Sequence, residues 1–184
     1  MITIDGPNMR DIMRQLPDEK DARKAAYRAI NRSLVSGRKA AGEEVAKDYK
    51  ISGGKVNKLG KLSRANSSNI EAKITWSGPA IPLEEWGTNP KNPPKRRRKK
   101  PILGTVFRSK KTTYRGAFVA RYNSGKARAY IRTTKKRFPI RRVYGPSAAQ
   151  LVAAKLVKER FTKRANEMLE KRLEHEINYI LSKK

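Results

Sequence analysis

Two long stretches with helical spacing of apolar residues, one toward each end of the chain, constrain the fold more than any other feature. Over residues 22–49, apolar or small residues recur every three or four positions, and Asp18 stands where this helix needs its N-cap. Over residues 151–180 the same spacing returns, and Ser147 stands at the cap position. Each stretch predicts a helix of roughly 30 residues, about 45 Å long.

The residues between these stretches alternate apolar and polar side chains, as half-buried strands do. The clearest case is residues 70–76, and shorter strand candidates are residues 104–108, 116–121 and 127–132. A turn at residues 123–125 joins the last two candidates. We therefore expect one antiparallel sheet of about four strands.

Together, these elements predict a fold of the α+β class, in which two long helices flank a small antiparallel β-sheet with an exposed basic loop. We expect a single domain over residues 1–184, with N-terminal helices over 8–49, a sheet region over 69–144 and a C-terminal helix over 147–182. The loop is residues 88–101, whose four prolines and seven cations leave nothing for a core. The helices carry more apolar surface than one small sheet can cover, which predicts contacts between subunits.

Charge is distributed very unevenly along the chain. The formal net charge is +29, from 45 Lys and Arg against 16 Asp and Glu. The 73 residues from Trp86 to Lys158 hold 22 of the cations and none of the acids. About three quarters of the net charge therefore belongs to the middle of the chain, and we expect an anionic partner such as nucleic acid or an acidic protein surface.

Composition also excludes several kinds of site. The chain has no cysteine and one histidine, which excludes disulfides, thiolate zinc or iron–sulfur sites and multi-histidine metal sites. We expect no metal and no cofactor. No stretch of roughly 20 apolar residues and no signal-peptide pattern is present, so we expect synthesis in the cytoplasm and no membrane partner.

The candidate polyanion site is the basic run of the loop together with the cations that follow it. Aromatic residues are interleaved with these cations, but their strand spacing favours the core over base stacking. The predicted DNA- or polyanion-contacting residues are Lys95, Arg96, Arg97, Arg98, Lys99, Lys100, Arg108, Lys110, Lys111 and Arg115.

Three motifs suggest chemistry but have simpler interpretations. His175 begins a zinc-protease-like pattern, yet the second histidine is missing, so we expect a surface residue of the last helix. Glu84 and Glu85 are adjacent and point different ways on an extended chain, and no third carboxylate follows until Glu159, which disfavours a metal nuclease. Residues 52–55, Ser-Gly-Gly-Lys, lack Walker-loop spacing and are interpreted as a helix terminator.

The order of several short motifs resembles the tailed-phage minor tail protein Z family over residues from about 22 to about 173. The first is Arg-Ala-Ile-Asn-Arg at 28–32 in the long helix, and the most specific is Phe-Pro-Ile at 138–140 before Tyr-Gly-Pro-Ser at 144–147. Between them stand Ile-Pro-Leu at 81–83 and Gly-Ala-Phe-Val at 116–119.

The resemblance implies a structural tail-completion protein, added to the head-proximal end of the tail and needed for head joining. It implies a place in the virion, contacts with tail tube, tail terminator and neck proteins, a homo-oligomeric, hexameric ring around the DNA channel, and no enzymatic activity. DNA in the channel would be contacted without sequence specificity. We interpret Tyr144, Gly145, Pro146 and Ser147 as a structural hinge, with Gly145 in a backbone conformation that other residues resist and Pro146 at the first helical position.

Two other classes remain open from the residues themselves. A basic nucleic-acid-binding protein, associated with RNA or DNA and without catalytic activity, would share the charge and the loop. A DNA-processing enzyme would share the partner. An assembly protein would oligomerise without nucleic acid, an RNA binder would copurify with RNA as a monomer, and a nuclease would depend on Glu84 or Glu85.

Overall fold

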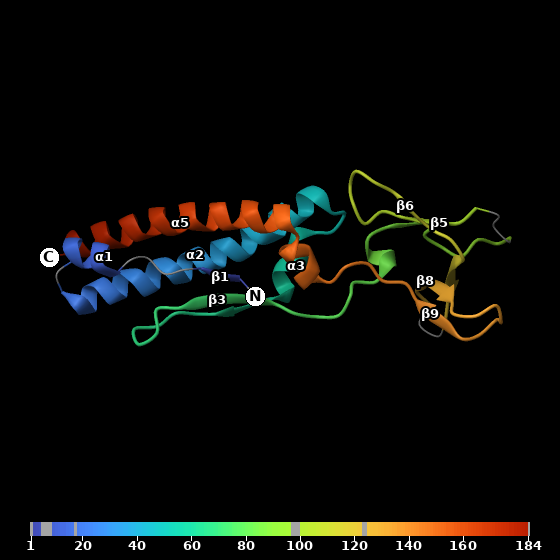
Figure 1. Cartoon of the computed structure of the whole chain (residues 1–184), viewed down its shortest axis with the longest axis horizontal. Helices are drawn as coiled ribbons and strands as arrows, with labels where there is room; N and C mark the ends of the chain where they lie inside the picture. The colour runs from blue at the N-terminus through green and yellow to red at the C-terminus, as the bar shows by residue number, and fades with distance from the viewer. Residues whose placement is uncertain (1, 5–8, 17, 97–99, 123–124, 184) are drawn as a thin grey trace.

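The structure is a computed structural model that describes residues 2–4, 9–16, 18–96, 100–122 and 125–183. The molecule is elongated, with two parts in line (Figure 1). The helical half holds residues up to 76 and from 148 onward, and the β half holds residues 83–143. Residues 77–82 and 144–147 connect the two parts and are called the junction below.

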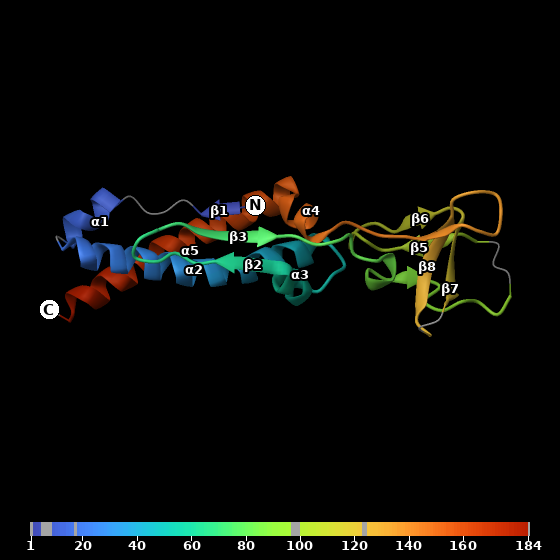
Figure 2. The same cartoon turned by 90° about the horizontal axis from the view of Figure 1, so that it is seen from below.

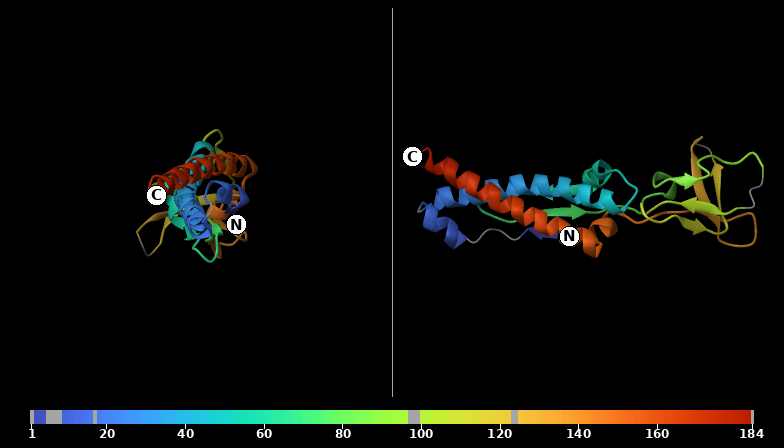
Figure 3. Two further views of the ribbon diagram at one scale, coloured as in Figure 1. Left: turned by 90° about the vertical axis from the view of Figure 1, so that its left-hand side faces the viewer. Right: turned by 90° about the horizontal axis from the view of Figure 1, so that it is seen from above.

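The two long helices form the core of the helical half by packing on each other. Helix α2 (Glu19–Asp48) begins as predicted, with the Asp18 carboxylate accepting a hydrogen bond of 2.9 Å from the backbone N–H of Lys20. Helix α5 (Lys155–Leu181) crosses α2 obliquely (Figure 3). The buried residues of α2 are largely small, which lets the helices approach closely; they include Ala22, Ala26, Ala29, Gly37 and Ala41. The apolar stripes that suggested subunit contacts are thus buried within one chain.

The predicted C-terminal helix is interrupted. Helix α4 (Ala148–Ala153) starts at Ser147, which forms a capping box with Gln150, and ends at Ala154, whose ψ of 130° is extended. Helix α4 packs on α2 and strand β3, whereas α5 packs along α2. Because α4 contacts strand β3 as well as α2, whereas α5 runs along α2, the two segments pack differently, and these tertiary contacts override a local sequence that favours helix throughout.

Two short helices flank α2. Helix α1 (Met9–Gln15) confirms the helix predicted there, and the side chains of Ile12 and Leu16 are buried against α2 and α5. Helix α3 (Gly53–Leu59) begins at the Ser-Gly-Gly sequence, whereas α2 already ends at Asp48 with Tyr49 as its C-cap, so this sequence starts a new helix instead of terminating α2. A Cβ on Gly53 would come within 2.7 Å of the Gly42 carbonyl oxygen, so these two backbones meet at glycines.

The first sheet lies along α2 (Figure 2). Its antiparallel order is β1 (Ile2–Ile4), β3 (Ala72–Trp76) and β2 (Gly60–Ser63). Strand β3 confirms the strand predicted over residues 70–76, and its alternate residues Ala72, Ile74 and Trp76 are buried. Strands β1 and β2 are too short for a clear alternation and were not predicted.

The β half contains two further three-stranded antiparallel sheets. One has the order β4 (Thr88–Asn89), β5 (Ile102–Gly104) and β6 (Thr112–Tyr114), and a short 3-10 helix, η1 (Leu83–Glu85), precedes it. The other has the order β7 (Ala117–Arg121), β8 (Ala127–Arg132) and β9 (Ile140–Arg142). The α+β class is confirmed, but the strands form three small sheets instead of one sheet between the helices.

The strand predicted over residues 104–108 is wrong after Gly104. Beyond this residue the chain leaves the sheet and reaches the C-terminal end of α2, where the Lys50 N–H donates to the Val106 carbonyl at 2.9 Å. Tyr49 and Phe107 form an isolated antiparallel bridge there, and their ring centroids are 4.9 Å apart. Contacts with the helical half therefore decide the conformation of this segment.

The junction is held by paired backbone segments. The Gly145 N–H donates to the Ile81 carbonyl at 2.8 Å, and the Leu83 N–H donates to the Val143 carbonyl at 3.0 Å. Trp86 is 1% exposed and packs under this crossing.

Across the described part of the chain, no helix is both long and apolar enough to cross a membrane.

Candidate nucleic-acid interface

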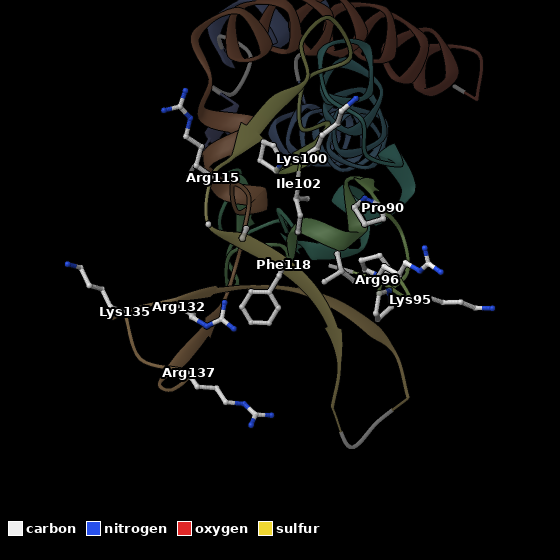
Figure 4. A pocket seen from close by; sticks show the side chains of 16 residues that line it. Pro90, Lys95, Arg96, Lys100, Ile102, Arg115, Phe118, Arg132, Lys135 and Arg137 are labelled. Atoms are coloured by element: carbon white, nitrogen blue, oxygen red, sulfur yellow. The ribbon is translucent and has the colours of Figure 1, made fainter. Parts of the chain in front are cut away.

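A groove of about 1090 Å³ opens in the β half, at the end of the molecule away from the helices (Figure 4). Three segments form it: the proline-rich loop between β4 and β5, the β6–β7 turn, and the β8–β9 loop. Its charged lining residues are all cations, and those in the described part are Lys95, Arg96, Lys100, Arg115, Arg132, Lys135 and Arg137.

Local sequence fixes the walls of this groove. Pro90, Pro93 and Pro94 line one wall, and the Arg121 guanidinium donates a hydrogen bond of 2.9 Å to the Asn92 side-chain oxygen, which ties this loop to β7. Gly116 has a φ of +73°, which a glycine adopts without strain, and forms the turn between β6 and β7. Loops form the rim of the groove, and the hydrogen bond from Arg121 fixes one of these loops to a strand of the sheet.

One aromatic side chain, Phe118, is among the groove's lining residues, and it contacts other rings of the same hairpin. Phe118 on β7 pairs with Tyr130 on β8, and their ring centroids are 6.1 Å apart. The guanidinium carbon of Arg132 lies 4.7 Å from the centroid of the Phe118 ring, a cation–π contact. Because Phe118 and Tyr130 are half-buried and Tyr122 is 41% exposed, the prediction that these aromatics belong to the core is wrong.

The groove cations have no acidic partners in the structure as described. The acidic partners of the salt bridges belong to the helical half or to η1. Arg142 of β9 binds the Glu84 carboxylate, with Nε at 3.0 Å from Oε1. Burial opposes the charged form of Arg142, but the hydrogen bond and charge of Glu84 raise its pKa above the usual value. The groove cations repel one another, and phosphate oxygens would relieve this repulsion.

The sequence-predicted cations do not all come together. Lys95, Arg96, Lys100 and Arg115 line the groove, while Arg97, Arg98 and Lys99 lie outside the described residues. Arg108 lies at the C-terminal end of α2, where its Nε donates to the Ala46 carbonyl at 2.6 Å and satisfies a helix-end acceptor. Lys110 and Lys111 are exposed in the β5–β6 loop and do not line the groove.

Three lining cations belong to the basic pattern of the sequence but were not among the predicted contacting residues. Arg132, Lys135 and Arg137 reach the groove because the β7–β8 register and the β8–β9 loop bring them opposite the proline-rich loop. The Thr133 N–H and hydroxyl both donate to the Pro139 carbonyl, at 3.2 and 3.1 Å, and close this loop. The sequence signal that could have placed these cations at the groove is the strand alternation over residues 127–132, together with the turn before it.

The predicted hinge is part of the junction. Tyr144 forms an isolated bridge with Pro82, and Ser147 caps α4 as predicted. Pro146 stands before the cap instead of at the first helical position. Gly145 does not have a positive φ; its requirement is space, because a Cβ there would lie 2.6 Å from the Trp86 indole nitrogen.

The other motifs occupy structural or surface positions. Glu84 pairs with Arg142, and Glu85 pairs with Lys55 of α3. His175 is exposed on α5, as predicted. Among the described residues, no group of three or more His, Cys, Asp and Glu side chains is placed to hold a metal ion.

Comparison with known proteins gives one match. A family model described as prophage minor tail protein Z (GPZ) matches residues 11–184. No curated protein and no solved structure matches the chain significantly. The matched region contains both long helices, the junction and the groove.

Proposed function

The chain belongs to the prophage minor tail protein Z family, and from this premise we propose that it completes the head-proximal end of the phage tail and makes the tail competent to join a head. The family match over residues 11–184 carries this proposal. A structural role in a phage tail is the family's own property; the head-proximal position and the joining step are the proposed additions. We also propose that the protein acts without catalysis.

The distribution of charge supports a place beside the DNA path. The groove cations have no carboxylate partners in the structure as described, and they are gathered at one end of an elongated molecule. A ring of such subunits with the β half toward the axis would surround a channel with cations. Phosphates of DNA in the channel would then relieve the repulsion among these cations without sequence recognition.

Ring formation needs a different surface from the helix stripes, which are buried. At the start of α5, Leu156 is 66% exposed, and Phe107 beside it is 43% exposed. Together with Tyr49 and Val157 they line a depression of about 490 Å³ between the two halves. We propose that this depression, called the Leu156 depression below, contributes the contact between neighbouring subunits of a hexameric ring.

Labelled virions test the proposed position. An epitope fused at the C-terminal end of α5, which lies at the tip of the helical half, should be detected by gold-labelled antibody where the tail meets the head. Label along the tail shaft or at the host-binding tip would contradict tail completion. A copy with the same epitope on a tail-tip protein controls for antibody access.

A further inference from the structure

We infer that the groove binds single-stranded nucleic acid, with bases stacking on Phe118 and the Arg132 guanidinium and phosphates contacting the surrounding cations. This inference deepens the proposed DNA contact and rests on it, because it assigns a strand state to the nucleic acid at the same site.

The aromatic residues lie on the face of the hairpin that does not form the core. Val119 and Ala129 pair across the strands and are buried, so their face belongs to the interior. Phe118 and Tyr130 pair at the neighbouring position and lie on the opposite face. Tyr122 extends the row, with its ring centroid 5.3 Å from that of Tyr130 in an edge-on contact. Of these three rings, Phe118 lines the groove, and Tyr130 and Tyr122 continue the row beyond it.

The row is combined with planar cations. Arg132 stacks over Phe118, and Arg128 pairs with Ala120 and so shares the aromatic face. Guanidinium planes and aromatic rings both stack on bases, and guanidinium groups also bind phosphate. The arrangement thus offers base and phosphate contacts within one hairpin.

The strand state follows from what each form of nucleic acid can present. In a duplex the base faces are covered by neighbouring base pairs, so a duplex would use the cations and leave Phe118 without a role. Single strands expose base faces, and proteins that bind them combine a cationic groove with stacking rings.

Fluorescence anisotropy with three labelled probes of equal length tests the inference: oligo(dT), oligo(U) and a DNA duplex. The full chain should bind oligo(dT) more tightly than the duplex. Phe118→Leu should weaken oligo(dT) binding about tenfold, or ~1.4 kcal/mol, and change duplex binding less than twofold. Phe118→Tyr keeps a ring and should retain binding.

The matched control is Tyr179→Leu, which removes an exposed aromatic side chain from α5, far from the groove, and should change none of the affinities. If Phe118→Leu melts at a clearly lower temperature, Arg132→Lys replaces it, because this exposed residue keeps its charge and loses its plane. Arg132→Lys should then weaken oligo(dT) binding while sparing duplex binding.

The outcomes separate this inference from the proposed function. Equal binding of oligo(dT) and duplex, with both insensitive to Phe118→Leu, would overturn the inference and leave the channel contact in place. No binding of any probe would overturn both the inference and the DNA contact. Binding of oligo(U) as tight as oligo(dT) supports a single-strand site that does not read the sugar, and tighter oligo(U) binding identifies RNA as the single strand.

Discussion

Gly145 lies directly against the indole ring of Trp86, so closely that a Cβ at position 145 would come within 2.6 Å of the indole nitrogen. The same nitrogen donates a hydrogen bond of 3.2 Å to the Ile81 carbonyl. The glycine, the tryptophan and Ile81 thus fix where the two chain segments of the junction cross. A side chain at 145 would disturb the contact that joins the halves of the molecule.

Gly145→Ala should therefore destabilise the protein by about 1–3 kcal/mol, the usual cost of overpacking a buried site. In a chain of this size each kcal/mol lowers the melting temperature by about 2–4 °C. Thermal unfolding followed by circular dichroism measures the change. Gly54→Ala is the control, because its Cβ would make only an ordinary contact of 3.7 Å in α3. Equal melting of Gly145→Ala and wild type would refute the close-approach argument.

Glu84→Gln should destabilise the protein by about 1–2 kcal/mol, because it weakens a charge-assisted hydrogen bond to half-buried Arg142. Glu71→Gln, at an exposed position, is the control and should melt as wild type does.

Incubating wild type and both variants with DNA and Mg²⁺ should leave the DNA intact in every case. If wild type cleaves the DNA and Glu84→Gln does not, the result would favour the nuclease alternative.

The groove cations should set the salt dependence of duplex binding. Replacing Lys95, Arg96 and Lys100 by Gln should flatten the slope of log affinity against log salt by roughly 0.9 per lost contact, or up to about 2.7. Replacing Lys61, Arg64 and Lys171 by Gln removes the same charge from exposed positions of the helical half. Equal effects of the two triple variants would show that net charge matters and the groove does not.

Leu156→Glu should weaken subunit association, because it replaces an exposed apolar side chain of the Leu156 depression with a charge. Sedimentation velocity, with and without purified tail tubes, measures the assembly state. Leu181→Glu, at the exposed end of α5, is the control. Unchanged rings in the Leu156 variant would move the subunit contact to another surface.

The sequence is sufficient for elements whose local signals agree with their packing. Asp18 and the spacing over residues 22–49 predict α2 almost to its last residue. The break at Ala154 is not predictable, because Ala-Ala-Lys favours helix and only tertiary packing, in which α4 contacts β3 as well as α2, imposes an extended residue.

The candidate site was predictable in part for a similar reason. The basic run at residues 95–100 is visible in the sequence, and its described members line the groove. Arg108 is near them in sequence but binds the end of α2, whereas Arg132 is distant in sequence and faces them across the groove. Strand register and loop closure decide such placements, and a linear charge pattern does not contain them.

Deletion of the gene from the phage or prophage that encodes this chain tests tail completion most directly. Electron microscopy of the lysate should show filled heads and tails of normal length that fail to form infectious particles. Purified wild-type protein added to the lysate should restore plaque-forming particles. Fully infectious particles from the deletion strain, or tails that never assemble, would contradict a role in completing the head-proximal end of the tail.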